Sequence, residues 1–65
     1  MALNIKDFPA IEAEFKAAGK DAAKIQRAVE KYTGPENGTE YDDKTGKLSI
    51  VSGWHADENG NVVRD

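Results

Sequence analysis

The chain has 65 residues, no cysteine and a formal net charge of −3 at pH 7. A chain of this length forms one small domain, which buries only about 60% of the surface exposed by its unfolded form. The lack of cysteine excludes disulfides and thiolate metal sites, and the negative charge argues against general affinity for nucleic acid. No apolar run approaches the roughly 18 residues of a membrane span, and the first six residues lack a signal-peptide pattern. We therefore expect a cytoplasmic protein.

Residues 7–33 are predicted to be helical, because they are rich in Ala, Glu, Lys, Gln and Arg. Asp7 can cap the first turn, and Pro9 falls within that turn, where its missing N–H costs little. Gly34 followed by Pro35 is a typical helix stop, since glycine favours the left-handed conformation after a helix and proline cannot continue it.

Gly19 decides between two helical arrangements. Large apolar residues recur at helical spacing on both sides of it, at Phe8, Ile11, Phe15, Ile25, Val29 and Tyr32. Ala18 and Ala22 bridge this rhythm, as one continuous helix requires, but Gly19 and Asp21 together form a typical stop and N-cap. A helix over residues 9–32 would be about 36 Å long, about twice the length of short strands, so a helical hairpin is favoured.

Beyond the helices, turn formers and short alternating segments dominate. Residues 34–38, Gly-Pro-Glu-Asn-Gly, are predicted to be a loop. Three strands are expected after the loop, at residues 39–42, 47–56 and 61–64. Each of the two connectors between them ends in glycine, a pattern typical of the longer β-hairpin loops.

Leu48, Ile50 and Trp54 share one parity along the second predicted strand, so we expect them to share its buried face. The predicted fold class is α+β. A helical hairpin, or one long helix, precedes a small three-stranded antiparallel β-meander over residues 39–65. Both parts are expected to form a single small domain over residues 1–65.

Basic residues form the first candidate binding surface, at three- and four-residue spacing: Lys16, Lys20, Lys24, Arg27 and Lys31. They lie in the half of the chain whose net charge is positive. Residues 1–32 carry a net +1 and residues 33–65 a net −4, which sum to −3. Such a stripe could bind an acidic partner or a phosphate-bearing ligand. A solvated helix face is the simpler interpretation. No aromatic residue interleaves with the stripe, which argues further against nucleic acid.

Trp54-His55 is the second candidate for partner binding. A tryptophan at a strand end can anchor a protein interface, and a histidine can add a pH-sensitive contact. In so small a domain, however, we expect Trp54 to complete the core.

No catalytic residue, metal ligand or cofactor-binding residue is expected. His55 has no cysteine partner, and Ser49 and Ser52 lie in no nucleophile elbow. Residues 57–61 lack the glycine and glutamate spacing of a calcium loop, and no glycine-rich phosphate loop with its lysine is present. A pocket of several hundred Å³ is not expected either, because it would take up much of so small a core.

By elimination, the sequence favours a small non-enzymatic module that binds another protein as an inhibitor, adaptor or modulator. One alternative is a structural homo-oligomer, in which residues 8–32 form a short coiled coil that a β domain caps. Its a positions would be Phe8, Phe15, Ala22 and Val29, and its d positions Ile11, Ala18, Ile25 and Tyr32. Another alternative is a sponge that captures an anionic nucleotide at a basic interface.

Overall fold

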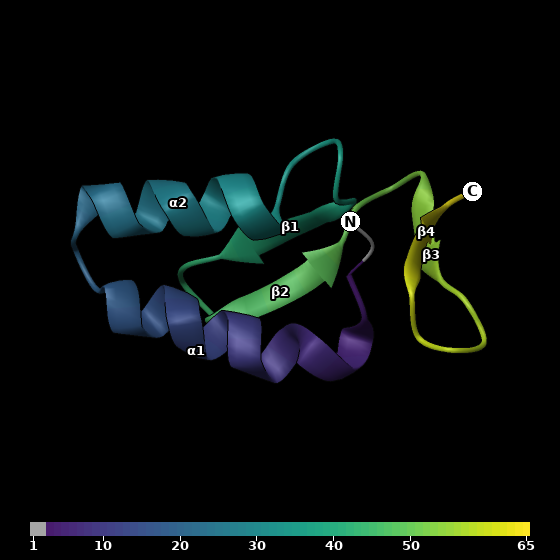
Figure 1. The fold of residues 1–65 in the computed structure, drawn as a ribbon, viewed down its shortest axis with the longest axis horizontal. Helices are drawn as coiled ribbons and strands as arrows, with labels where there is room; N and C mark the ends of the chain where they lie inside the picture. Colours follow the sequence, from purple (N-terminus) through teal and green to yellow (C-terminus); the bar gives the residue numbers. More distant parts are fainter. Residues whose placement is uncertain (1–2) are drawn as a thin grey trace.

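The computed structural model describes residues 3–65, which fold into two helices followed by two β-hairpins (Figure 1). A 3-10 turn, Ile5–Asp7, leads directly into α1, Phe8–Ala18, and α2, Ala22–Tyr32, runs back beside α1. The α+β class and the helical hairpin are confirmed. The alternative of one continuous helix over residues 8–32 is wrong, and the coiled coil that depended on it is not formed.

The reversal between the helices depends on Gly19 and Asp21. Gly19 follows α1 with φ +57° and ψ −118°, and a positive φ is disfavoured for any residue that carries a Cβ. The Asp21 carboxylate then accepts hydrogen bonds from the N–H groups of Ala23 and Lys24, at 3.1 and 3.2 Å. Asp21 is therefore the expected N-cap of α2.

The start of α1 differs from the expectation in its cap. Asp7 precedes the helix, but its side chain makes no capping hydrogen bond. Its backbone is already helical, with φ −88° and ψ −10°, whereas a capping side chain needs an extended backbone to reach back. The side chain of Asn4 instead accepts from the N–H of Lys6 at 2.9 Å and caps the preceding 3-10 turn. Pro9 lies in the first turn of α1, as expected.

The strands form two separate two-stranded sheets, so the three-stranded meander is wrong. β1, Thr39–Asp42, pairs with β2, Lys47–Ile50, and β3, Trp54–Ala56, pairs with β4, Val62–Arg64. Both pairs are antiparallel. The single strand expected over residues 47–56 is therefore divided between the two sheets.

The interruption lies between Val51 and Trp54. The N–H of Trp54 donates to the C=O of Val51 at 3.2 Å, which closes a tight four-residue turn. Gly53 supplies the positive φ of +93° within this turn. Because the chain reverses locally, β3 leaves the first sheet and starts a second one at the end of the molecule (Figure 1).

The N-terminal segment holds the second hairpin against the rest of the molecule. The N–H of Val62 donates to the C=O of Leu3 at 2.7 Å, and the N–H of Ile5 donates to the C=O of Gly60 at 2.8 Å. These bonds place the segment along the outer edge of β4 as a short antiparallel addition. The beginning of the described chain and its last hairpin therefore lie side by side.

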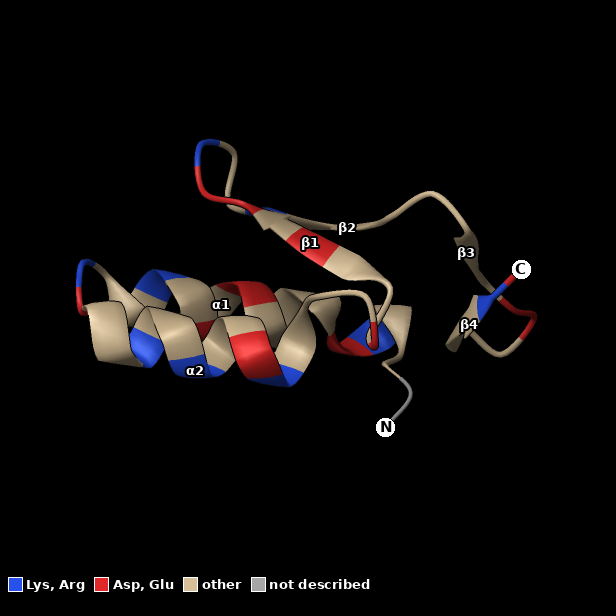
Figure 2. Cartoon of the chain, turned by 90° about the horizontal axis from the view of Figure 1, so that it is seen from above, with Lys and Arg blue, Asp and Glu red and all other residues tan. Residues whose placement is uncertain are grey.

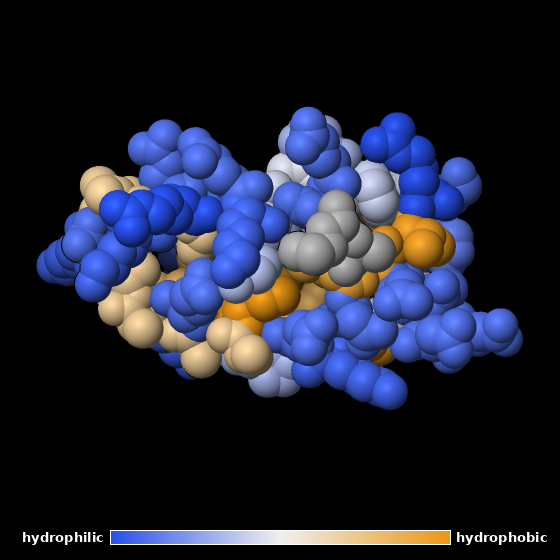
Figure 3. Space-filling model, viewed as in Figure 1, coloured by the Kyte–Doolittle hydropathy of each residue, from blue (hydrophilic) through white to orange (hydrophobic). Residues whose placement is uncertain are grey.

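The core gathers apolar residues from all parts of the described chain: Leu3, Ile11, Phe15, Ala28, Leu48 and Val62. The rings of Phe15 and Tyr41 stack with centroids 4.1 Å apart, which joins α1 to the inner face of the first sheet. Leu48 and Ile50 share that inner face, as expected, whereas Trp54 packs against the core from the second sheet. On the face shown in Figure 3, hydrophobic side chains appear as patches among hydrophilic ones. No helix in residues 3–65 has the length and apolar character to cross a membrane.

Candidate functional site

The two outer edges of the first sheet use their backbone groups differently. In an antiparallel pair, successive residues direct their N–H and C=O groups alternately toward the partner strand and away from it. The C=O of Gly38 accepts from the N–H of Val51 at 2.9 Å, so Gly38 faces the partner strand. By alternation, Tyr41 in β1 and its partner Leu48 in β2 direct their backbone groups outward.

Glu12 closes the outer edge of β2. This half-buried residue of α1 accepts a hydrogen bond at 2.7 Å from the backbone N–H of Leu48 to its Oε2. A hydrogen bond to a carboxylate is stronger than one between neutral groups. A charged side chain on a strand edge also hinders the addition of another strand. The Glu12 contact therefore both ties α1 to β2 and protects this edge.

The outer edge of β1 is open at Tyr41. Near its start, the C=O of Thr39 accepts from the N–H of Gly34 at 3.1 Å, which occupies the edge there. No residue within 3–65 hydrogen-bonds to the outward N–H and C=O of Tyr41. We call this stretch, residues 40–43, the open edge. It offers a donor and an acceptor in the arrangement that a neighbouring strand would use.

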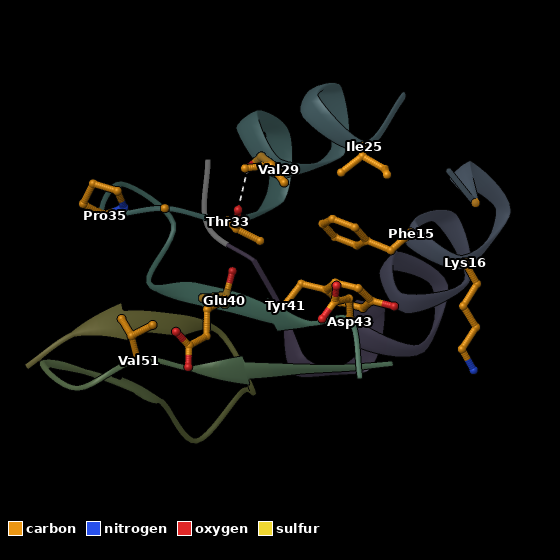
Figure 4. Close-up of a pocket in the computed structure, with 13 residues that line it drawn as sticks. Phe15, Lys16, Ile25, Val29, Thr33, Pro35, Glu40, Tyr41, Asp43 and Val51 are labelled. Carbon is orange, nitrogen blue, oxygen red and sulfur yellow. Dashed lines mark hydrogen bonds between the residues drawn. The ribbon is translucent and has the colours of Figure 1, made fainter. Parts of the chain in front are cut away.

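An apolar groove of about 860 Å³ lies between the open edge and α2 (Figure 4). Ile25 and Val29 project into it from α2, and Phe15 and Tyr41 line it from the core side. Ile25 and Val29 are one helical turn apart, so they form a continuous apolar strip. Val29 is 42% exposed. The groove is therefore an apolar surface that the protein itself leaves uncovered.

The strip on α2 stays uncovered because of the way the sheet is placed. The first sheet forms a layer over the helices (Figure 2), and β2 contacts α1. Ala28 is the only residue of α2 that is buried. The end of α2 is tied to β1, since the buried Thr39 hydroxyl donates to the C=O of Tyr32. An amphipathic helix normally buries its whole apolar stripe, whereas α2 buries only part of it.

The charged residues that line the groove are mainly acidic on the β1 side. Glu40 and Asp43 come from β1 and the turn after it, and Lys16 comes from α1. Among residues 3–65, neither carboxylate forms an ion pair. Across the β1–β2 pair, Glu40 faces the uncharged Ser49. Glu40 is thus an exposed carboxylate beside the open edge with no cross-strand cation.

The predicted basic residues do not form one surface, because the hairpin divides them between α1, the turn and α2 (Figure 2). Lys16 reaches the groove, and Lys20 is exposed in the turn. Lys24 and Arg27 come together beside a small hollow of about 250 Å³ between the helices, which Glu14 also lines. The hollow therefore brings Lys24 and Arg27 together, and Lys31 follows Arg27 by one helical turn on α2.

Lys31 interacts with its neighbour Tyr32. Its Nζ lies 4.9 Å from the centre of the Tyr32 ring. Side-chain hydrogen bonding to Tyr32, followed by the charges of Tyr32 and Glu14, raises the pKa of Lys31 above its ordinary value. The Tyr32 hydroxyl in turn donates to Glu14 at 3.0 Å. The contact between the two helices is thus made by Tyr32 and Glu14, and Lys31 lies beside Tyr32 on α2.

Trp54 and His55 point to opposite faces of β3, as neighbours in a strand do. Trp54 packs over Gly38, where a Cβ would lie only 2.2 Å from the indole, and the Arg64 guanidinium lies 4.9 Å from its ring. Trp54 therefore packs against the core, as expected. His55 is exposed, and its Nδ1 lies 2.6 Å from a carboxylate oxygen of Asp65.

The groove was not predicted from the sequence, and the expectation that the chain is too small for a pocket of this size is wrong. The space lies between the surfaces of α2 and β1, outside the core, so it takes no core volume. The available signal was the strong segregation of apolar and polar residues along α2, which two short strands cannot cover.

Within residues 3–65, no group of three or more His, Asp or Glu side chains is placed to hold a metal ion. No family model, curated protein or solved structure shows a significant match to the chain. A functional assignment must therefore be based on the groove and the open edge.

Proposed function

We propose that this protein is a non-enzymatic module that binds another protein, as an inhibitor, adaptor or modulator, through the groove between α2 and β1. The observation that carries the proposal is the uncovered strip of Ile25 and Val29 beside the open edge. An apolar side chain from a partner that covers Val29 would remove apolar surface from water. Uncovered apolar patches of this kind commonly mark protein interaction sites.

The charges around the groove support the binding of a partner. Glu40, Asp43 and Lys16 are exposed at the groove, where charged side chains can recognise groups of opposite charge on a partner. The nucleotide sponge has less support, since the basic residues are divided between the helices. The cytoplasmic location stays a prediction.

Selection of peptides from a displayed random library against the full chain tests the proposed function. Selected peptides should bind the wild type but lose at least tenfold in affinity for Val29→Arg, because the arginine places a charge in the apolar groove. Ile5→Arg is a matched control, since Ile5 is 43% exposed and Val29 42%, yet Ile5 does not line the groove. Peptides that bind Val29→Arg as well as the wild type would contradict the proposal. Circular dichroism establishes that both variants are folded.

A further inference from the structure

We propose that the occupant of the groove is an extended segment of a partner protein, which adds to the open edge of β1 as a third strand. The segment would carry apolar residues alternating with lysine or arginine. This inference rests on the proposed function and deepens it, because it names the conformation and the charge of the partner segment.

The unpaired backbone groups of Tyr41 favour an extended segment as the occupant of the groove. Its N–H and C=O both face away from β2, and no described residue pairs with them. A residue of an added antiparallel strand supplies a matching acceptor and donor, as in the peptide-binding modules that extend a sheet. A helix in the groove has its own backbone groups paired internally and would leave both groups of Tyr41 unpaired.

The alternation of side chains across an added strand gives the sequence pattern. Residues on the inner face of the strand would point toward Ile25 and Val29, so apolar side chains fit there. Residues on the outer face would lie beside Glu40, which shares that face with Asp42. A lysine or arginine beside Glu40 supplies the cross-strand cation that Ser49 does not.

A second copy of this chain is a poorer occupant of the open edge. In a two-fold pairing of β1 centred on Tyr41, each Glu40 would face Asp42 of the other copy. Like charges directly opposite in a sheet are destabilising. Residues 33–65 as a whole carry seven acidic and three basic residues, a net of −4, so the longer-range field also favours a basic partner.

The added strand is short. The contact of Gly34 with Thr39 occupies one end of the edge, so the partner can pair only along residues 40–43. Four residues in a strand span about 13 Å. Specificity must therefore come from the side chains in the groove and at its rim, in addition to a few backbone hydrogen bonds.

Synthetic peptides test this inference directly on the full chain. The main probe is an eight-residue peptide of alternating valine and lysine with blocked ends. A second probe carries glutamate in place of lysine. Two more carry N-methyl groups, either on all valines or on all lysines. The lysine peptide should bind, and it should slow hydrogen exchange of the Tyr41 amide. The glutamate peptide should bind at least tenfold more weakly.

N-methylation distinguishes a strand from other modes of binding. In an antiparallel strand the valine N–H groups face β1, and in a parallel strand the lysine N–H groups do. One of the two methylated peptides should therefore lose binding while the other retains it. Equal binding by both methylated peptides would overturn the added strand.

Glu40→Lys should weaken binding of the lysine peptide by about three- to tenfold. Glu58→Lys is the matched control, because Glu58 is exposed in the loop between β3 and β4 and should leave the affinity unchanged. An unchanged affinity in Glu40→Lys would overturn the basic character of the partner. Concentration-dependent dimers of the protein alone, lost in Val29→Arg, would assign the edge to a second copy and overturn the inference.

Failure of this inference is distinguishable from failure of the proposed function. If displayed peptides bind in a Val29-dependent manner but neither protect the Tyr41 amide nor alternate apolar and basic residues, the added strand is wrong and the groove remains a binding site. If Val29→Arg affects no peptide, both proposals are wrong.

Discussion

The two outer edges of the first sheet lie beside helices of similar length, but the backbone of one edge is hydrogen-bonded and that of the other is unpaired. At the β2 edge, α1 directs the Glu12 carboxylate onto the N–H of Leu48 at 2.7 Å. At the β1 edge, α2 presents Ile25 and Val29, which cannot accept a hydrogen bond, and the backbone of Tyr41 stays without a described partner. One carboxylate directed at the strand therefore pairs the backbone of the β2 edge, whereas the β1 edge, where α2 offers no such side chain, keeps the backbone groups of Tyr41 unpaired among the described residues.

The largest loss of stability is expected from a substitution that displaces the start of β1, because β1 could then no longer pair with β2 in the observed register. Gly38→Ala places a Cβ at φ +73°, 2.2 Å from the indole of Trp54. The left-handed backbone and the overlap should together reduce the free energy of unfolding by about 2–5 kcal/mol.

Gly34→Ala is the control for Gly38→Ala, since Gly34 also has a positive φ, +103°, but no atom lies within 4 Å of its added Cβ. Urea denaturation of both variants separates the backbone cost from the overlap. Equal losses in the two variants would show that the contact of Gly38 with Trp54 is unimportant.

Removal of the Glu12 carboxylate opens the protected edge. Glu12→Ala leaves the N–H of Leu48 without its acceptor, which should cost about 1–3 kcal/mol. Glu12→Gln keeps an acceptor oxygen and should cost less. Hydrogen exchange provides the local measurement: the Leu48 amide should exchange much more slowly than the Tyr41 amide in the wild type, and this difference should shrink in Glu12→Ala. Equal exchange of the two amides in the wild type would contradict the comparison of the edges.

A smaller change in stability is expected from a substitution in the turn between α1 and α2, which places α2 beside β1. Gly19→Ala should destabilise the protein by about 1 kcal/mol, because alanine disfavours a positive φ, and its Cβ would contact no atom within 4 Å. The same substitution in the middle of a continuous helix would stabilise by roughly 1 kcal/mol. The sign of the change in urea denaturation therefore tests the hairpin independently.

The smallest effect on stability is expected at the groove itself. Val29→Ser changes a side chain that is 42% exposed, so the free energy of unfolding should change by no more than about 0.5 kcal/mol. Peptide binding should nevertheless weaken. A large loss of stability in this variant would show that Val29 belongs to the core and not to a binding surface.

Local features of the fold were predictable from particular residues. Gly19 and Asp21 indicated the reversal between the helices, and the structure has the glycine at positive φ and the aspartate as a cap. The division of the strand at Gly53 was not predictable, because a glycine in a strand is compatible with a bulge, a bend or a turn. Asp7 was predicted as the cap of the first helix, but its side chain caps nothing, and the capping side chain near this end is Asn4, at the 3-10 turn before α1.

The candidate site could not be predicted from local sequence patterns, because it depends on how α2 and β1 are placed relative to each other. Lys24 and Arg27, predicted from their spacing, do lie together, whereas helical spacing marked Ile25 and Val29 only as apolar positions on the face of a helix. Periodicity identifies the apolar face of a helix, but it does not show whether a neighbour covers that face.

The sequence by itself determined where the two helices end and where the chain reverses between them, since caps and positive-φ glycines act through atoms a few residues away. Only the tertiary structure decided which strand edge is paired and which is open. That outcome depends on the position of the sheet over two helices, which is set by the packing of Phe15, Leu48 and the rest of the core together. Glu12 and Leu48 are far apart in the chain, and no local pattern connects a carboxylate on α1 with the backbone of β2.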